Sequence, residues 1–335
     1  MQSDSFRKNF KVLDVFDRTI TVPDSFVVRS NKIGSGNGEA KLYIANKTEV
    51  ADFVSNTRAS DGSLPCFLLK ADLINYLNAA KSEYINSSFE FQYTPREKLL
   101  ELWNQRMSFV STLPEVIDFS VFEQDQIVGP RGYINSNDDG YQIIRDISLP
   151  LISYISIMKV STGESVKYYF KLFVDFNAIK NIQNGPLVFK YGQKIGSPQK
   201  TSESTKNEVK KSLARDGQGK YRERLLDQCP YCPITMLNDE RLLIASHIKP
   251  WAVCSDSEKI DPYNGFMLSP LYDKLFDRGF ITFTDDKMMI ISDWLSPANK
   301  KRLGLTEKYI QLLPMDEKRK KYLEFHREHV FQGII

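Results

Sequence analysis

The fold is decided by three short stretches near the C-terminal end of the chain: SHIKPW (Ser246–Trp251), NGFML (Asn264–Leu268) and LYDKLFDRG (Leu271–Gly279). They place one histidine, one asparagine and two carboxylates within a little over thirty residues. Such a combination is typical of hydrolytic chemistry, because it offers a proton acceptor and cation ligands close together in the sequence.

The histidine and the carboxylates are expected on different elements. His247 follows the apolar run Leu242–Ile244, which predicts that it ends a buried strand. Asp273 and Asp277 are four residues apart and therefore share a helix face. A neutral imidazole can take a proton from water, and two aspartates supply the hard oxygen ligands that suit magnesium or manganese. These residues predict metal-assisted hydrolysis of a phosphodiester, with His247 as the general base.

This ordered set of residues resembles the HNH nuclease family, in the branch whose first motif reads His-Ile-x-Pro-Trp. The resemblance covers about the last 120 residues. It also includes Gly217–Leu226, Cys232–Thr235, Phe280–Phe283 and Tyr322–Arg327. It implies a β-hairpin plus helix around one metal ion, the ββα-metal fold.

The resemblance also implies separate roles for the motif residues. Asn264 would hold the loop from about Lys249 to Tyr263 and so orient His247. Asp273 stands where the family often has histidine, which keeps a metal ligand but favours magnesium over softer ions. Ser246 stands where many relatives carry a ligating aspartate, so Asp277 is expected as the second protein ligand.

Each of these residues also has a plainer interpretation. His247 taken alone is typical of a hydrogen-bonded structural residue, and Asn264-Gly265 taken alone is a turn dipeptide. Asp277-Arg278-Gly279 is also a helix end with Gly279 as its left-handed cap. We list as DNA-binding candidates, with simple solvation as the alternative, Lys249, Arg278, Lys220 and Arg222.

Length and composition set the outer limits. A chain of 335 residues predicts two domains. It has no apolar stretch of about twenty residues and a polar start, which predicts a cytoplasmic protein without a membrane partner. The net charge of +3 is weak evidence for a nucleic-acid partner.

The predicted fold class is α+β, with a mixed N-terminal DNA-recognition domain at 1–195, a basic linker at 196–214 and a C-terminal HNH domain at 215–335. The segment Lys200–Arg222 carries seven basic residues against three acids and suits a phosphate backbone, although an ordinary solvated linker fits equally. In the first domain, helical periodicity marks Lys70–Lys81 and Pro95–Arg106, and a β-hairpin is expected from Leu151–Val160 and Val166–Phe176.

Two motif-like stretches are given plain interpretations. Lys32–Lys41 lacks the ending of a phosphate loop and predicts a hairpin turn. Cys229 and Cys232 form a C-x-x-C pair with no second pair, so a structural zinc is not expected; the four cysteines give no disulfide framework either.

Three functional classes are compatible with this sequence. The first is a restriction endonuclease that selects sites on double-stranded DNA through its N-terminal domain. The second is a modification-dependent endonuclease that reads a methylated or hydroxymethylated cytosine. The third, a non-catalytic DNA-binding protein with a degenerate scaffold, is disfavoured by the intact set of His247, Asn264 and Asp273. A homodimer on DNA is expected, because one site per chain cuts one strand at a time.

Overall fold

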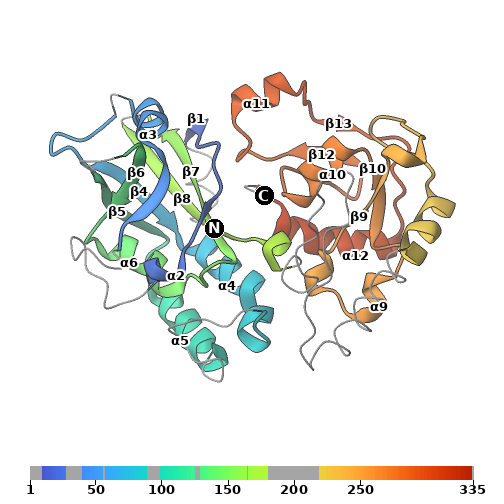
Figure 1. Cartoon of the computed structure of the whole chain (residues 1–335), viewed down its shortest axis with the longest axis horizontal. Helices are drawn as coiled ribbons and strands as arrows, with labels where there is room; N and C mark the ends of the chain where they lie inside the picture. The colour runs from blue at the N-terminus through green and yellow to red at the C-terminus, as the bar shows by residue number, and fades with distance from the viewer. Residues whose placement is uncertain are drawn as a thin grey trace. The chain divides into compact units, whose positions relative to one another are not determined.

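The computed structural model describes residues 10–27, 40–55, 57–88, 99–124, 129–163, 165–179 and 219–333. These residues form two compact units. Unit 1 takes the described residues up to 175 together with 293–305, and unit 2 takes those of 176–292 and 306–333 (Figure 1). The predicted linker 196–214 and most of the Lys32–Lys41 turn lie outside the described residues.

Unit 1 is built on one sheet. Its described strands run in the order β1-β7-β8-β4-β5-β6-β3, and β2 also pairs with β7. The strands are β1 (Lys11–Val15), β2 (Ile20–Thr21), β3 (Leu42–Asn46), β4 (Leu64–Leu69), β5 (Val116–Gln124), β6 (Arg131–Asn135), β7 (Ser153–Ser161) and β8 (Val166–Val174). The helices are α2 (Asp24–Val27), α3 (Lys47–Val54), α4 (Lys70–Ile85), α5 (Leu99–Thr112), α6 (Asp139–Ile147) and α11 (Pro297–Arg302).

The two central strands form the expected hairpin. β7 and β8 are antiparallel, with Ser161 opposite Val166, and nearly all of their side chains are buried. The sequence-based hairpin is therefore confirmed. Strands β5 and β6 instead alternate between buried and exposed residues, so one of their faces remains at the surface.

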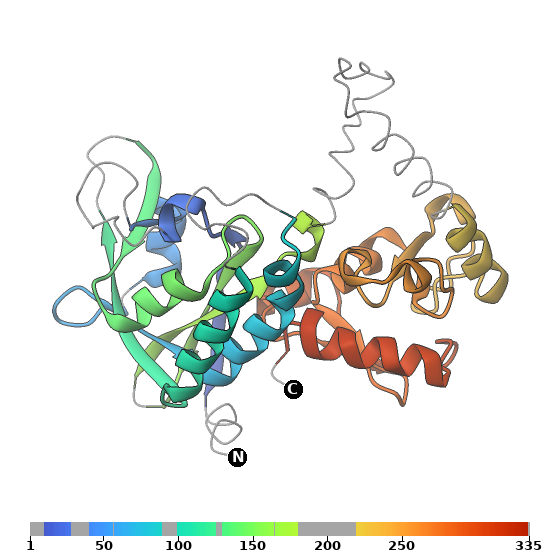
Figure 2. The ribbon, with the colours of Figure 1, turned by 90° about the horizontal axis from the view of Figure 1, so that it is seen from below.

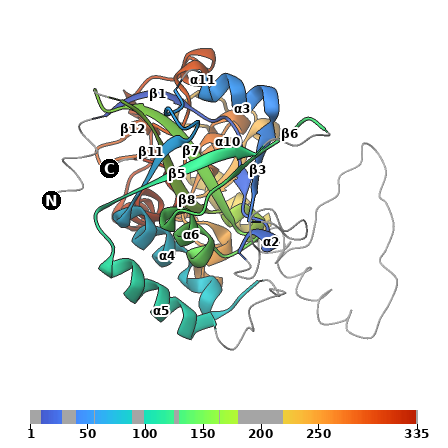
Figure 3. The same cartoon turned by 90° about the vertical axis from the view of Figure 1, so that its left-hand side faces the viewer.

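Helices cover the sheet at β8 and β5. α4 packs on β8 and α6 on β5, while α5 lies beside α4, as Figures 2 and 3 show. Trp103 Nε1 of α5 donates to the carbonyl of Leu77 in α4 at 2.9 Å. The helix predicted at Lys70–Lys81 is confirmed and continues to Ile85. The one predicted at Pro95–Arg106 is confirmed from Leu99 and continues to Thr112, whereas residues 95–98 lie outside the described part.

The core of unit 1 includes a residue from late in the sequence. Phe67 stacks on Tyr169 at 4.9 Å between ring centroids, and the ring of Trp294 lies 5.0 Å from Tyr169. Trp294 is buried. The segment 293–305 is therefore attached to unit 1 by apolar packing, although it follows the nuclease motifs in the sequence.

Unit 2 contains the predicted motifs. It begins with short helical stretches at 176–179 and 219–228. Its strands are β9 (Ile244–His247), β10 (Gly265–Leu268), β11 (Ile281–Phe283), β12 (Met288–Ile291) and β13 (Lys308–Tyr309). Its other helices are α9 (Asp256–Lys259), α10 (Pro270–Asp277) and α12 (Glu317–Phe325), with single turns η2 (Glu240–Leu242), η3 (Trp251–Val253) and η4 (His326–Val330).

Strands β9 and β10 form an antiparallel hairpin, and α10 follows β10 almost directly. The expected β-hairpin plus helix and the α+β class are confirmed. Gly265 lies in β10 opposite His247, so the plainer interpretation of Asn264-Gly265 as a turn is wrong. A Cβ at Gly265 would come within 1.9 Å of the hydroxyl of Tyr221, so this contact requires glycine.

Helix α12 is fastened to the loop between β9 and β10. Arg319 is buried, and its guanidinium donates to the carbonyls of Gly265 and Pro262 at 3.3 Å each. Tyr322 donates its hydroxyl to Asp261 Oδ2 at 3.0 Å. The C-terminal helix therefore supports the segment that carries the motif residues.

Candidate active site

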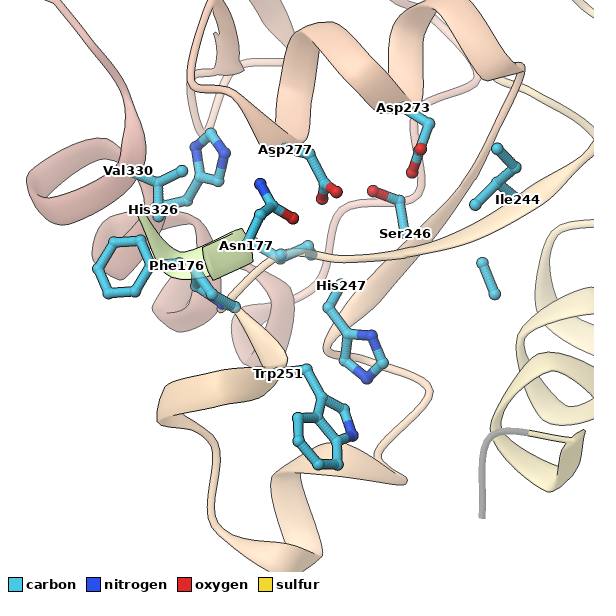
Figure 4. A pocket seen from close by; sticks show the side chains of 13 residues that line it. Phe176, Asn177, Ile244, Ser246, His247, Trp251, Asp273, Asp277, His326 and Val330 are labelled. Carbon is cyan, nitrogen blue, oxygen red and sulfur yellow. The ribbon is translucent and has the colours of Figure 1, made fainter. Parts of the chain in front are cut away.

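A pocket in unit 2 brings together three of the predicted site residues. His247, Asp273 and Asp277 line it, and so do residues of β9 and of the turn that follows (Figure 4). Its remaining described lining comes from 176–177 and from the C-terminal stretch at His326 and Val330.

Helix α10 places the two carboxylates. Ser269 is its N-cap and Pro270 occupies the first turn, which suits the fixed φ of proline. The helix ends before Gly279, which has φ +68° and whose added Cβ would meet the carbonyl oxygen of Val330 at 2.0 Å. The helix-end interpretation of Asp277–Gly279 is therefore correct, and it coexists with the position of Asp277 in the pocket.

Ser246 adds a third oxygen to the carboxylate side of the pocket. Its side chain is buried, and its Oγ has no hydrogen-bond partner among the described residues. Figure 4 shows this hydroxyl directed toward Asp273 and Asp277. A buried hydroxyl without a partner is costly, so this group is suited to a ligand that enters the pocket.

A divalent cation fits this donor set. The described residues contain no group of three or more histidines, cysteines or acids arranged to hold a metal ion. Magnesium, however, is usually bound by one or two carboxylates, with water and substrate phosphate completing its shell. Asp273 and Asp277 provide that minimum, and Ser246 Oγ offers a further hard oxygen.

The proton state of His247 is set by the loop. Its Nε2 lies 3.0 Å from the carbonyl oxygen of Lys259. Because a carbonyl only accepts hydrogen bonds, Nε2 must carry the proton, and Nδ1 of the neutral ring is then the basic nitrogen. The imidazole also stacks on Tyr221, with 4.1 Å between ring centroids. In Figure 4 the ring points away from Ser246 and from the carboxylates of Asp273 and Asp277.

Asn264 is fully buried and holds the loop that precedes it. Its Oδ1 accepts from the backbone N–H of Lys249 at 2.8 Å, and its Nδ2 donates to the carbonyl of Glu258 at 3.2 Å. Nδ2 also donates to Cys254 Sγ at 3.2 Å. The residue after Glu258 is Lys259, whose carbonyl binds the ring of His247. The side-chain amide of Asn264 therefore acts on His247 through the loop.

Two of the four predicted DNA-binding residues make strong contacts within the protein. Lys249 Nζ lies 2.7 and 2.8 Å from the two carboxylate oxygens of Glu258. Although partial burial raises the pKa of Glu258, bonds from Lys249 and Ser255 lower it overall. Arg222 donates to the carbonyls of Leu243 and Glu240 at 2.8 and 2.6 Å.

The other two predicted DNA-binding residues are placed differently. Lys220 is exposed on the helix at 219–228. Arg278 is the C-cap of α10, next to Asp277. Arg278 is therefore the one of the four that adjoins a pocket carboxylate directly in the sequence.

Sequence reasoning did not select several residues of the pocket. Phe176 and Asn177 enter it from a segment some seventy residues before β9, and no motif in the sequence marks them. His326 lines it as well, with its Nε2 bonded to the carbonyl of Phe276 at 3.1 Å and its Nδ1 near Thr282 Oγ1 at 3.0 Å. Burial lowers the pKa of His326 to about 3, so this ring is neutral and structural.

The C-x-x-C pair is buried and follows directly after the helix at 219–228 of unit 2. Cys229 and Cys232 are both free thiols. Cys229 Sγ donates to the carbonyl of Tyr231 at 3.3 Å, and burial raises the pKa of this thiol. A raised pKa keeps the sulfur of Cys229 protonated.

Comparison with known families agrees with this geometry. Residues 232–284 match the family model described as HNH endonuclease. No curated protein matches the chain. The matched stretch contains His247, Asn264, Asp273 and Asp277, so this part of the chain is an HNH endonuclease domain.

The match supports a nuclease that acts on DNA. HNH nucleases generally use a divalent metal. Among the described residues, no helix is both long and apolar enough to cross a membrane.

Proposed function

We propose that the protein is a metal-dependent DNA endonuclease of a restriction system, in which the site of unit 2 hydrolyses phosphodiester bonds. The observation that supports this proposal most directly is the pocket that His247, Asp273 and Asp277 share. The hydrogen bond from His247 Nε2 to Lys259 leaves Nδ1 as the proton acceptor, which is what a general base requires.

The proposed steps assign one task to each group. His247 Nδ1 removes a proton from water, the oxygen attacks phosphorus, and the bond from phosphorus to the leaving oxygen breaks. Asp273 and Asp277 would hold a magnesium or manganese ion, with Ser246 Oγ as a further oxygen donor. The ion would supply positive charge to the phosphoryl and leaving oxygens. Asn264 positions the loop and, through it, His247.

Site selection is assigned to the N-terminal part of the chain, proposed as a recognition domain spanning 1–195, with a linker at 196–214 and the nuclease domain at 215–335. The argument is physical, because contacts with the phosphate backbone carry no base information and specificity must come from groups that reach the bases. In this proposal Lys220, Arg222, Lys249 and Arg278 contact phosphates and not bases. Lys249 and Arg222 would contact a phosphate while keeping their present hydrogen bonds, to Glu258 and to the carbonyl of Leu243.

Digestion of defined DNA tests the proposal. Unmodified and cytosine-modified double-stranded DNA are incubated with magnesium, with manganese or with chelator, and the ends are sequenced. The restriction proposal expects metal-dependent cuts at a recurring sequence in unmodified DNA. Cuts confined to modified DNA would replace it by the modification-dependent alternative. If the protein bound DNA but cut neither DNA with either metal, the alternative of a non-catalytic DNA-binding protein would stand.

A further inference from the structure

The outer surface of strands β3, β5 and β6 carries an unusual set of side chains. In the register, Tyr43 is opposite Tyr133, Tyr133 is opposite Gln124, and Asn135 is opposite Phe122. Directly paired residues point to the same side of a sheet. We define the aromatic face by six residues of this side: Tyr43, Phe122, Gln124, Arg131, Tyr133 and Asn135.

The opposite side of the same strands is the core. Leu42, Val121 and Ile134 are buried there. A half-buried antiparallel sheet normally turns polar residues outward. Here Tyr43 is 46% exposed and Phe122 is 42% exposed. Aromatic rings on the solvent side are therefore not required by the packing of the described residues of unit 1.

Cations are arranged over these rings. The rings of Tyr43 and Tyr133 meet edge to face, with 5.6 Å between centroids. Lys41 Nζ lies 4.9 Å from the centre of the Tyr133 ring, and the guanidinium carbon of Arg131 lies 6.0 Å from that of Tyr43. Farther along β5, the outward Asp118 is paired with Lys167 at 2.8 Å. The aromatic face itself contains no carboxylate among its six defined residues.

The two amides complete the chemistry of this surface. Asn135 Nδ2 donates to Gln124 Oε1 at 2.8 Å, which leaves each amide with further donor or acceptor capacity. Side-chain amides can pair with base edges, cations with phosphates, and aromatic rings with the flat faces of bases. Base faces are covered in an intact duplex and exposed only in unpaired or extruded nucleotides.

We propose that the aromatic face binds DNA by stacking unpaired or extruded bases on Tyr43, Tyr133 and Phe122, with Lys41 and Arg131 on the adjoining phosphates. This inference rests on the proposed function for the choice of DNA as partner. It assigns to unit 1 a surface that detects locally opened DNA.

Binding measured without cleavage tests the inference. Fluorescence anisotropy is recorded in chelator with the full chain and three labelled DNAs: a single strand, its duplex, and the same duplex with one central unpaired base. The double variant Tyr43→Ala/Tyr133→Ala should bind the single strand and the bulged duplex about 10-fold or more weaker, with a smaller change for the intact duplex. Arg131→Ala should lower the slope of log affinity against log salt by about one.

Two controls make the result interpretable. Tyr43→Phe/Tyr133→Phe keeps both rings and should bind like wild type, which separates stacking from loss of fold. Phe109→Ala removes a ring of 44% exposure from α5 and should have no effect. Unchanged binding of the double alanine variant to the single strand and to the bulged duplex would overturn the inference, and so would an equal loss on all three DNAs.

The nuclease proposal and the inference about the aromatic face can fail independently of each other. If wild type binds bulged DNA through this face but cuts no DNA with either metal, only the nuclease assignment falls. If wild type cuts DNA and the double alanine variant binds and cuts normally, only the aromatic face falls.

Discussion

Asn264 and Lys249 are joined across a fifteen-residue separation: the side-chain oxygen of Asn264 accepts the backbone N–H of Lys249 at 2.8 Å. The same amide reaches Glu258, whose neighbour Lys259 holds the ring of His247. One buried side chain therefore fixes both the start of the loop and the segment that orients the imidazole.

Asn264→Ala should lower turnover on the order of 10²-fold, because a displaced Lys259 carbonyl would no longer hold His247 in place. DNA affinity should stay nearly unchanged, since Asn264 is fully buried. Single-turnover cleavage and anisotropy measure the two quantities. A collapse of affinity with normal turnover of bound DNA would make Asn264 a DNA contact.

His247→Ala should reduce cleavage by about 10²–10⁴-fold, which is the usual cost of losing a general base. Folding and DNA binding should remain, because the His247 ring is only partly buried and the substitution leaves the buried Tyr221, on which it stacks, in place. Circular dichroism and anisotropy provide the controls. Near-wild-type turnover would remove His247 from the mechanism.

Removing the carboxylates should separate their contributions to the metal site. Asp273→Ala should be inactive in both magnesium and manganese, whereas Asp277→Ala should be impaired and partly rescued at high metal concentration. Both substitutions remove negative charge that attracts the ion. Cleavage rates across a metal titration test this order. Full activity of wild type in chelator would exclude the metal site.

The sequence predicted the parts of the site that a short local pattern encodes. The helix with Asp273 and Asp277 follows from a four-residue spacing, and His247 does end a strand. The expectation that this strand is buried was wrong, because Ile244 is exposed and Leu242 lies in the turn η2 before the strand. It also predicted the loop role of Asn264, through the resemblance to HNH nucleases. The hydrogen bonds of Asn264 to Lys249 and Glu258 agree with that role.

What the sequence did not predict depends on distant contacts. Asn177 enters the pocket from far upstream, and Trp294 joins the core of unit 1 from beyond the nuclease motifs. Neither residue belongs to a periodic pattern or a spaced motif that would mark it in the sequence. Lys249 was selected as a DNA contact from its charge, but its pairing with Glu258 required the folded loop to be seen.

Unit 2 should lose stability in mild acid because of His326. Burial lowers the pKa of this ring to about 3 in the folded chain, against about 6.5 when it is exposed. Between these two pH values His326 is protonated in the unfolded chain but not in the folded one. The stability that the neutral His326 ring gives to the folded state is therefore fully present above about pH 6.5 and is lost as the pH falls toward 3. The slope from this group approaches about 1.4 kcal/mol per pH unit.

Denaturant unfolding at pH 7.5 and pH 5 checks this prediction. His326→Gln removes the titration while keeping a side chain able to hydrogen-bond. The variant should show a smaller loss of unfolding free energy between the two pH values than wild type. An equal loss in both proteins would assign the acid sensitivity to other groups.

A double-strand break requires either two protomers or two successive attacks by one, if the proposed site at 232–284 is the one that cuts. We expect a dimer on DNA, with nicked DNA as an intermediate. Helix α12 is not the expected contact, because its Arg319 and Tyr322 already hold the loop between β9 and β10.

Mixing active protein with an excess of His247→Ala, under conditions where subunits exchange, should convert double-strand breaks into nicks. Agarose gels of supercoiled plasmid resolve both products. Asn264→Ala in the same excess should act alike at short reaction times, because it too yields a DNA-bound partner that cuts far more slowly. An unchanged ratio of nicks to breaks would show that a single protomer cuts the two strands in turn.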